Sequence, residues 1–397
     1  MKQLKILFLV IITLLPLVLV SCYGTTQPTR GWSGTAFDDG IIYAGTRDGK
    51  VVAVNSSSQS ILWSYIVTTT TSSGMSCGPT TAPTAIYTTP IVDGDLVYIG
   101  TYSGHVLALS MLARSQNLTF PQRGYGEWEW DCPIDNAKSN AIVADLLVSD
   151  DAIYVSSSNG RVYSLDKEFG DQNWESEVLD ERHRKLWTSP VIQGDTLYVS
   201  TYDGHIHSLS SETGELSDWS FKSEVGFASS PVIYEDTIFL GSFDRYLYAV
   251  KIGSDELMWE FPQEKPAGNW FWASPIVDEG IVYAGCLDGK LYAIEAETGK
   301  KVWEFDAGDP IICSPVLMGN LLVIVNKSGT VYVFDLSAEI GDEAVPLKTI
   351  SIGADVRNSF CAQEGLVYIR GEDNWVYVVD IDKGKVSWNF DLTKKEE

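Results

Sequence analysis

Histidine and cysteine, the usual ligands of zinc, are scarce in this chain. Its 397 residues include four histidines and six cysteines, and no cysteines show the C-x-x-C or histidine-paired spacing of a zinc site. No P-loop is present, and no paired carboxylates stand out from the acidic turns. We therefore expect no structural metal, and the sequence offers no catalytic residues.

Basic residues are also few. The chain has 28 Lys and Arg against 53 Asp and Glu, a formal net charge of −25. A strongly acidic surface repels phosphate backbones and anionic lipid headgroups. Nucleic acid is therefore not expected as a partner.

No apolar run reaches the roughly 20 residues that a comfortable membrane span needs. The longest, Ile6 to Val20, follows Lys2 and Lys5 and suits the core of a secretory signal. The segment that ends it, Leu19-Val20-Ser21-Cys22, resembles a bacterial lipobox, in which the cysteine is lipidated and becomes the new N-terminus. We expect a lipoprotein signal peptide at 1–21 and a lipidated tether at 22–31. An uncleaved signal anchor is the alternative.

A repeat fills most of the chain after this tether. Its anchor is an aromatic or apolar residue at the centre of an expected strand, and the anchors are 40 to 56 residues apart. The anchors are Tyr43, Tyr98, Tyr154, Tyr198, Phe239, Tyr283, Val323 and Tyr368. Five copies carry proline eight residues earlier, at Pro90, Pro190, Pro231, Pro275 and Pro315. A polar turn follows each anchor, as in Asp288-Gly289, between two alternating apolar runs.

Each copy predicts four short strands, and the fourth usually carries tryptophan. These tryptophans are Trp63, Trp174, Trp219, Trp259, Trp303 and Trp388. Such a unit is typical of a β-propeller blade, which buries its faces by stacking in a ring. We predict an all-β, eight-bladed β-propeller of four-stranded antiparallel blades over 32–391, with a charged tail at 392–397. The tryptophan rings are expected to cover the seams between blades.

The segment from Ala293 to Trp303 resembles the tryptophan-docking motif of pyrroloquinoline-quinone (PQQ)-like propellers, which runs Ala-x-Asp-x-x-Thr-Gly-x-x-x-Trp. Weaker copies end at Trp219 and Trp388. The resemblance implies a quinoprotein-like propeller, and two branches are relevant. One is the dehydrogenases that bind PQQ and Ca²⁺ over the central axis. The other is the non-catalytic BamB-like lipoprotein branch, which is an eight-bladed propeller on a lipid tether.

Three insertions interrupt the repeat, at about 66–87, 112–140 and 262–272. We expect all three between the tryptophan strand of one blade and the first strand of the next, and so on one face of the ring. Cys77 and Cys132 lie in the two longest insertions and would pair as a disulfide in an oxidising compartment. The chain has no adjacent cysteine pair, a feature that catalytic quinoproteins typically carry, and this counts against that branch.

Aromatic residues outside the repeat register are the candidates for recognition. They are Tyr125, Trp128, Trp130, Trp270, Phe271 and Trp272. Plugging the channel mouth or covering a blade edge is the alternative role for them. Arg182 and Arg184 belong to the only basic cluster and could meet an acidic partner, PQQ carboxylates or simply nearby acids.

The leading hypothesis is a non-catalytic scaffold that binds a protein partner in the cell envelope. It would be exported and held by its lipid on the outer membrane or on the extracellular face of the cell membrane. No cofactor is expected under this hypothesis. The alternatives are a PQQ-dependent dehydrogenase, which would need PQQ with calcium, and an extracellular sensor or carbohydrate-binding propeller.

Overall fold

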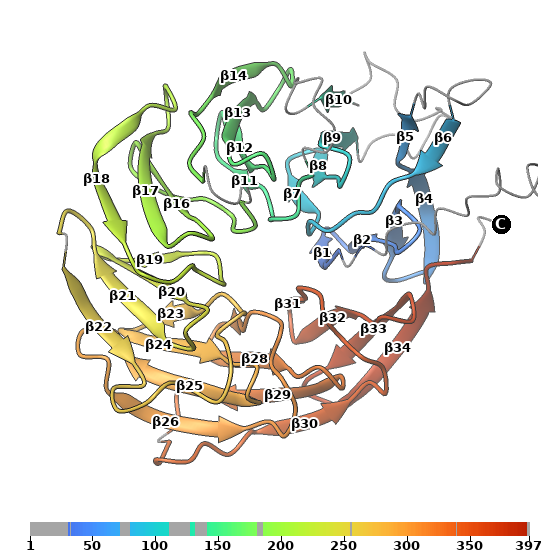
Figure 1. Cartoon of the computed structure of the whole chain (residues 1–397). Coiled ribbons are helices and arrows are strands. Elements are labelled where there is room, and N and C mark those ends of the chain that lie inside the picture. Colours follow the sequence, from blue (N-terminus) through green and yellow to red (C-terminus); the bar gives the residue numbers. More distant parts are fainter. Residues whose placement is uncertain are drawn as a thin grey trace, which may run out of the picture.

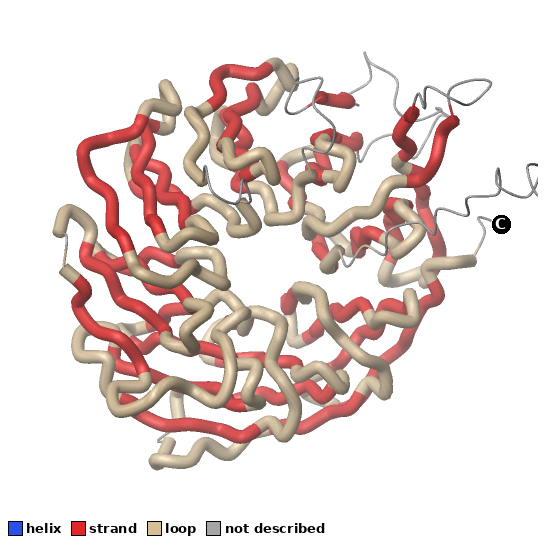
Figure 2. The backbone as a smooth tube through the Cα atoms, viewed as in Figure 1, coloured by secondary structure: helices blue, strands red, loops and turns tan. Residues whose placement is uncertain are grey.

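Eight four-stranded antiparallel sheets form a ring, which confirms the predicted eight-bladed propeller (Figure 1). The computed structural model describes residues 31, 33–71, 80–110, 128–131, 141–180, 186–254, 256–338 and 340–394. The described backbone consists of strands that loops and turns connect (Figure 2). Within the described ranges, no helix is long and apolar enough to cross a membrane.

Each blade takes its four strands from consecutive stretches of chain. Blade 1 consists of β1 (Thr35–Asp38), β2 (Ile41–Gly45), β3 (Lys50–Asn55) and β4 (Ser60–Ile66), and blade 2 consists of β7 (Ile91–Asp93), β8 (Leu96–Gly100), β9 (His105–Ser110) and β10 (Trp128–Asp131). Blade 3 consists of β11 (Leu147–Val148), β12 (Ala152–Ser156), β13 (Val162–Asp166) and β14 (Gln172–Glu175), and blade 4 consists of β15 (Val191–Gln193), β16 (Thr196–Ser200), β17 (His205–Ser210) and β18 (Leu216–Lys222). Blade 5 consists of β19 (Val232–Tyr234), β20 (Thr237–Gly241), β21 (Leu247–Lys251) and β22 (Leu257–Phe261), and blade 6 consists of β23 (Ile276–Asp278), β24 (Ile281–Gly285), β25 (Lys290–Glu295) and β26 (Lys301–Asp306). Blade 7 consists of β27 (Val316–Met318), β28 (Leu321–Val325), β29 (Thr330–Asp335) and β30 (Lys348–Ser351), and blade 8 consists of β31 (Cys361–Gln363), β32 (Leu366–Arg370), β33 (Trp375–Asp380) and β34 (Lys385–Asp391). A separate hairpin joins β5 (Thr68–Thr71) to β6 (Thr80–Pro83).

The position of a strand in its blade decides its hydrophobic pattern. Second strands are almost continuously buried, as in β2, because both of their faces pack against neighbouring blades. Outer strands alternate between exposed and at least partly buried residues, as in β34, because one of their faces meets solvent. The continuous core therefore runs around the ring, between blades.

The outer-strand tryptophans cross the seams, as the sequence predicts. The indole Nε1 of Trp174 donates to the carbonyl of Ser211 in blade 4, at 3.0 Å. In the same way Trp259 of blade 5 donates to the carbonyl of Ala296 in blade 6, at 2.9 Å. These rings are scaffold, since each satisfies its polar atom and buries its apolar face against the next blade.

Contacts between two complete sheets, and not an exchanged strand, close the ring between blades 8 and 1. The N–H of Thr35 donates to the carbonyl of Ser359 at 3.2 Å. The fully buried guanidinium of Arg370 donates through Nη1 to the carbonyl of Ser33 at 3.0 Å. Phe37 stacks on Tyr368 with ring centroids 4.3 Å apart. A buried cation, a stacked aromatic pair and a backbone hydrogen bond thus join blades 8 and 1.

The expected position of the second insertion was wrong. Trp128 lies in β10, the outer strand of blade 2, and its register partner is Ala108. Trp63 pairs with Ala53 in blade 1 and occupies the same place in the repeat. The long segment before β10 interrupts blade 2 between its third and fourth strands, so tryptophan arrives later than the spacing of the other blades predicts. Trp128 and Trp130 are therefore strand residues of a blade and not part of an inter-blade connection.

Candidate functional site at the channel mouth

The candidate site lies at one end of the sheets. The turns between second and third strands emerge at this end, together with the connections from each blade to the next. We call it the connection face. The described part of the insertion at 66–87 begins on this face, because it follows β4, and the insertion at 262–272 lies on it, because it follows β22.

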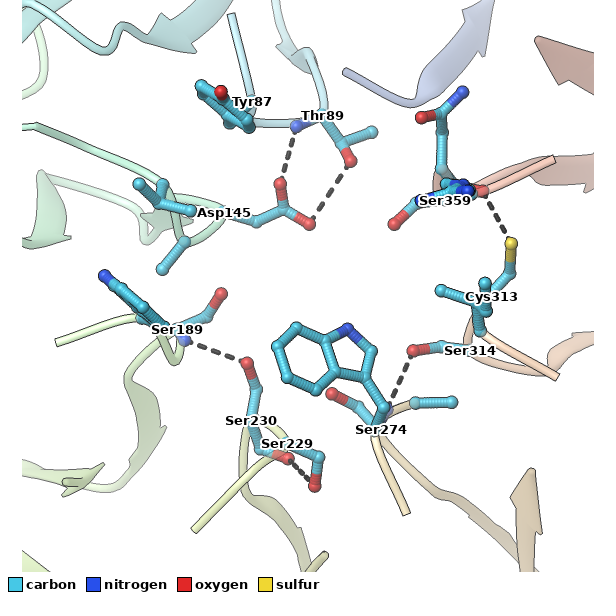
Figure 3. A pocket seen from close by; sticks show the side chains of 18 of the residues that line it. Tyr87, Thr89, Asp145, Ser189, Ser229, Ser230, Ser274, Cys313, Ser314 and Ser359 are labelled. Carbon is cyan, nitrogen blue, oxygen red and sulfur yellow. Dashed lines mark hydrogen bonds between the residues drawn. The ribbon is translucent and has the colours of Figure 1, made fainter. Parts of the chain in front are cut away.

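A cavity of about 660 Å³ opens on this face, over the central axis (Figure 3). Seven blades contribute one residue each to its wall at the same repeat position, nine residues before the anchor. These wall residues are Thr89, Asp145, Ser189, Ser230, Ser274, Ser314 and Ser359. The repeat thus builds a ring of small hydroxyl side chains, with one carboxylate among them.

Hydrogen bonds between neighbouring blades hold this ring in place. The N–H of Ser189 donates to Oγ of Ser230 at 2.9 Å, and the N–H of Ser274 donates to Oγ of Ser314 at 3.0 Å. Both hydroxyls act here as acceptors. Each therefore retains its own proton for donation into the cavity.

Asp145 is the only carboxylate in the cavity wall among the described residues. Its Oδ1 accepts from the N–H of Thr89 at 2.5 Å, and its Oδ2 accepts from the Thr89 hydroxyl at 3.2 Å. Burial raises the pKa of Asp145, and the two hydrogen bonds from Thr89 oppose that rise. The group is thus a fixed acceptor that carries unused lone pairs.

Aromatic side chains border the cavity on the side of blades 4 to 6. We call this set the aromatic arc: Trp187, Tyr202, Phe243, Trp270 and Trp272. Its ring centroids lie 6.0 Å apart for Trp187 and Tyr202, 4.9 Å for Tyr202 and Phe243, and 5.3 Å for Phe243 and Trp270. Four members are between 37% and 42% exposed, and Phe243 is half-buried between them. Contiguous exposed aromatic surface of this kind is uncommon without a binding role.

The structure divides the predicted recognition residues. Trp270 and Trp272 belong to the exposed arc, as a recognition role requires. Phe271 does not fit that role, because its side chain is fully buried in the core between blades 5 and 6. Successive residues of this extended segment point to opposite sides, so Phe271 faces inward between two outward tryptophans.

Several predicted residues lie outside the described ranges. They are Cys22, Cys77, Tyr125, Cys132, Arg182 and Arg184. The Cys77–Cys132 disulfide and the role of the basic cluster therefore stay predictions. For Trp128 and Trp130, the structure describes the strand backbone alone.

Sequence reasoning missed most of the site, although a signal was present. Rim residues recur eleven residues before the anchor, as Tyr87 and Trp187 do. Arc residues recur four residues after the anchor, as Tyr202 and Phe243 do. These residues follow the repeat register, so a search for aromatics that interrupt the repeat passes over them.

The donor set of the cavity does not fit PQQ with calcium. Calcium takes six to eight oxygen ligands, usually with several carboxylates, and Asp145 is the one carboxylate in the described wall. No group of three or more His, Cys, Asp or Glu in the described ranges could hold a metal ion. The rim guanidinium of Arg357 is already engaged, since its Nε lies 2.8 Å from a Glu372 carboxylate oxygen.

A hydrolase nucleophile elbow is not expected either. The segment Gly74-Met75-Ser76-Cys77-Gly78 matches G-x-S-x-G, but it lies outside the described residues. It connects β5 to β6, two antiparallel strands of one hairpin. The motif needs a strand-to-helix turn, so this match has the wrong context.

Comparisons with known proteins agree with this architecture. BamB from Moraxella catarrhalis is similar, with 18% identity and a TM-score of 0.64, covering 87% of this chain and 95% of that one. The computationally designed protein Ika8 is similar with 15% identity and a TM-score of 0.66, covering 88% and 96%. The quinohemoprotein alcohol dehydrogenase ADHIIG from Pseudomonas putida HK5 has 12% identity and a TM-score of 0.61, covering 88% and 70%. These likenesses show the fold.

A search of curated protein sequences finds no match. The family model described as "Outer membrane protein assembly factor BamB" matches residues 23–176 and 244–344, well over half of the chain. On this match, the chain belongs to the family of the outer membrane protein assembly factor BamB.

Proposed function

We propose that this protein is a non-catalytic, membrane-tethered scaffold that binds a protein partner in the cell envelope. The aromatic arc is the observation that carries the proposal. Its four exposed rings form one surface, which Phe243 connects, on the ring of blades, an arrangement that favours interface hot spots. Membership of a family named for an assembly factor also supports a protein partner.

Charge around the arc indicates the chemistry of the partner. Asp203 lies in the turn that carries Tyr202, and Asp244 follows Phe243 directly. The chain as a whole carries a formal net charge of −25. We therefore expect a partner surface with apolar side chains at its centre and lysine or arginine around them, because complementary charge speeds encounter and fixes orientation.

Site-specific photo-crosslinking in cells tests this interface. A photoreactive phenylalanine analogue at Tyr202 or Trp270 is expected to capture a discrete envelope protein. The same analogue at Phe169 serves as the control, because Phe169 is 50% exposed but lies in the β13–β14 turn, at the opposite end of the sheets. Equal capture from all three positions, or no capture from the arc, would refute the proposed face.

The membrane tether is tested separately. Metabolic labelling with an alkyne fatty acid is expected to mark the wild-type chain and not the Cys22→Ala variant, because the cysteine thiol is the attachment point. The labelled protein should sediment with membranes, and the variant should not. Labelling that persists without Cys22 would contradict lipidation at this residue.

A further inference from the structure

The cavity at the channel mouth combines a polar wall with aromatic side chains. Hydroxyl groups and one carboxylate surround its centre, and Trp187 and Trp272 also line it (Figure 3). A volume of about 660 Å³ is typical of pockets for small molecules. We propose that this cavity binds a neutral carbohydrate, as one or two sugar residues at the end of a glycan.

The wall matches the hydrogen-bonding character of sugar hydroxyls. A sugar hydroxyl both donates and accepts, so its site needs donors and acceptors side by side. Ser230 and Ser314 offer hydroxyl protons, since each oxygen already accepts from the preceding blade. Asp145 offers charged acceptor lone pairs, and Thr89 holds that carboxylate in a fixed orientation.

The rim supplies flat apolar surfaces. Trp187 and Trp272 line the cavity from blades 4 and 6, and Tyr87 and Tyr102 line it from blade 2. The two tyrosine rings lie 5.4 Å apart, between centroids. The C–H faces of a pyranose ring pack against aromatic rings, which lets a sugar bury its apolar side while its hydroxyls meet the wall.

Other small-ligand classes fit this cavity less well. An anion would need free cationic groups, and the Nε of Arg357, the guanidinium in the described wall, is paired with Glu372 at 2.8 Å. A cation would need more than the single carboxylate of Asp145. A purely apolar ligand would leave the hydroxyl ring and that carboxylate without partners, at a cost in binding.

The test uses the full-length protein on a glycan array. Titration with maltotriose, cellotriose and chitotriose follows, with intrinsic tryptophan fluorescence as the signal. We expect at least one of these glycans or an array glycan to bind saturably. The variants Trp272→Ala and Asp145→Asn should each weaken that binding about tenfold or more, as loss of one buried charged hydrogen bond or one stacking contact does. Phe169→Ala, at the opposite end of the sheets, should leave it unchanged.

Three results would overturn the proposal: no saturable binding of any array glycan or trisaccharide, binding that both Trp272→Ala and Asp145→Asn leave intact, or displacement of the bound state by peptides alone. Urea unfolding of both variants shows whether they are folded. Asp145→Asn is expected to stay folded, because the amide has the shape of the carboxyl group and its Oδ1 can still accept from the N–H of Thr89. The proposal does not rest on protein binding, since Tyr202 and Trp270 lie outside the cavity wall and report on the partner separately.

Discussion

The docking of each tryptophan onto the next blade makes a sharp prediction for Gly299. This residue has a φ of +69°, and a Cβ placed on it would lie 2.7 Å from Cδ2 and Cγ of the Trp259 ring. Gly299→Ala therefore meets two penalties, left-handed backbone strain and overpacking against an aromatic ring. Strain costs about 1–2 kcal/mol and overpacking about 1–3 kcal/mol, so we expect the free energy of unfolding to fall by about 3 kcal/mol.

A second glycine of the same blade separates the two penalties. Gly280 has a φ of +78°, and a Cβ there would meet nothing within 4 Å. Gly280→Ala should therefore lower the unfolding free energy by the strain alone, about 1–2 kcal/mol. Urea unfolding followed by tryptophan fluorescence measures both variants under the same conditions.

A double-mutant cycle identifies the clash partner. Trp259→Ala alone should cost about 3–5 kcal/mol, because it removes a buried ring and its hydrogen bond to Ala296. In that background the cost of Gly299→Ala should drop to the strain seen at Gly280, which gives a coupling energy of about 1–3 kcal/mol. The reasoning fails if Gly299→Ala costs no more than Gly280→Ala, or if its cost is the same with and without the Trp259 ring.

Three further predictions concern charged groups. Hydrogen bonds from Lys290 and Lys301 lower the pKa of Glu304 below 4.5. The contribution of Glu304 to folding stability is therefore present above pH 4.5 and is lost on acidification. Glu304→Gln should remove about 1 kcal/mol of this pH-dependent stability, measured by urea unfolding at a series of pH values. Burial and the neighbouring His205 lower the pKa of His207 below 6.5, so acidification below pH 6.5 protonates His207 in the unfolded chain first and lowers folding stability. His207→Gln should remove this loss of stability. An unchanged slope of stability against pH in the variant would contradict the prediction. Arg370→Ala should cost about 3 kcal/mol in urea unfolding, because it empties a fully buried site at the ring closure; a loss typical of a surface residue would contradict that role.

The blade architecture could be predicted from the sequence because its interactions are local. Each sheet pairs strands that follow one another within a few tens of residues, and glycine or aspartate at the turns fixes their positions. The tryptophan-docking role also followed from the repeat, and the Nε1 bonds of Trp174 and Trp259 confirm it.

Local reasoning failed where a side-chain direction or a long insertion mattered. Phe271 has the same type of neighbours as Trp270 and Trp272, yet it is buried because the extended backbone turns it toward blades 5 and 6. Trp128 belongs to a regular outer strand, but the segment before it shifted it away from the expected spacing. In both cases the residue type was known from the sequence, but its burial or its place in a strand depends on contacts that the sequence does not list.

The sequence by itself determined that this chain is an eight-bladed propeller, since stacking its repeated four-stranded units in a ring buries their faces. Only the tertiary structure decided where binding groups converge. Thr89 and Ser359 lie far apart in the chain but share one cavity wall, and Tyr202 meets Phe243 from the next blade, 4.9 Å away. The physical reason is ring closure, which brings one repeat position from each blade to a common axis. The sequence of a single blade does not show which residues of the other blades will lie beside it.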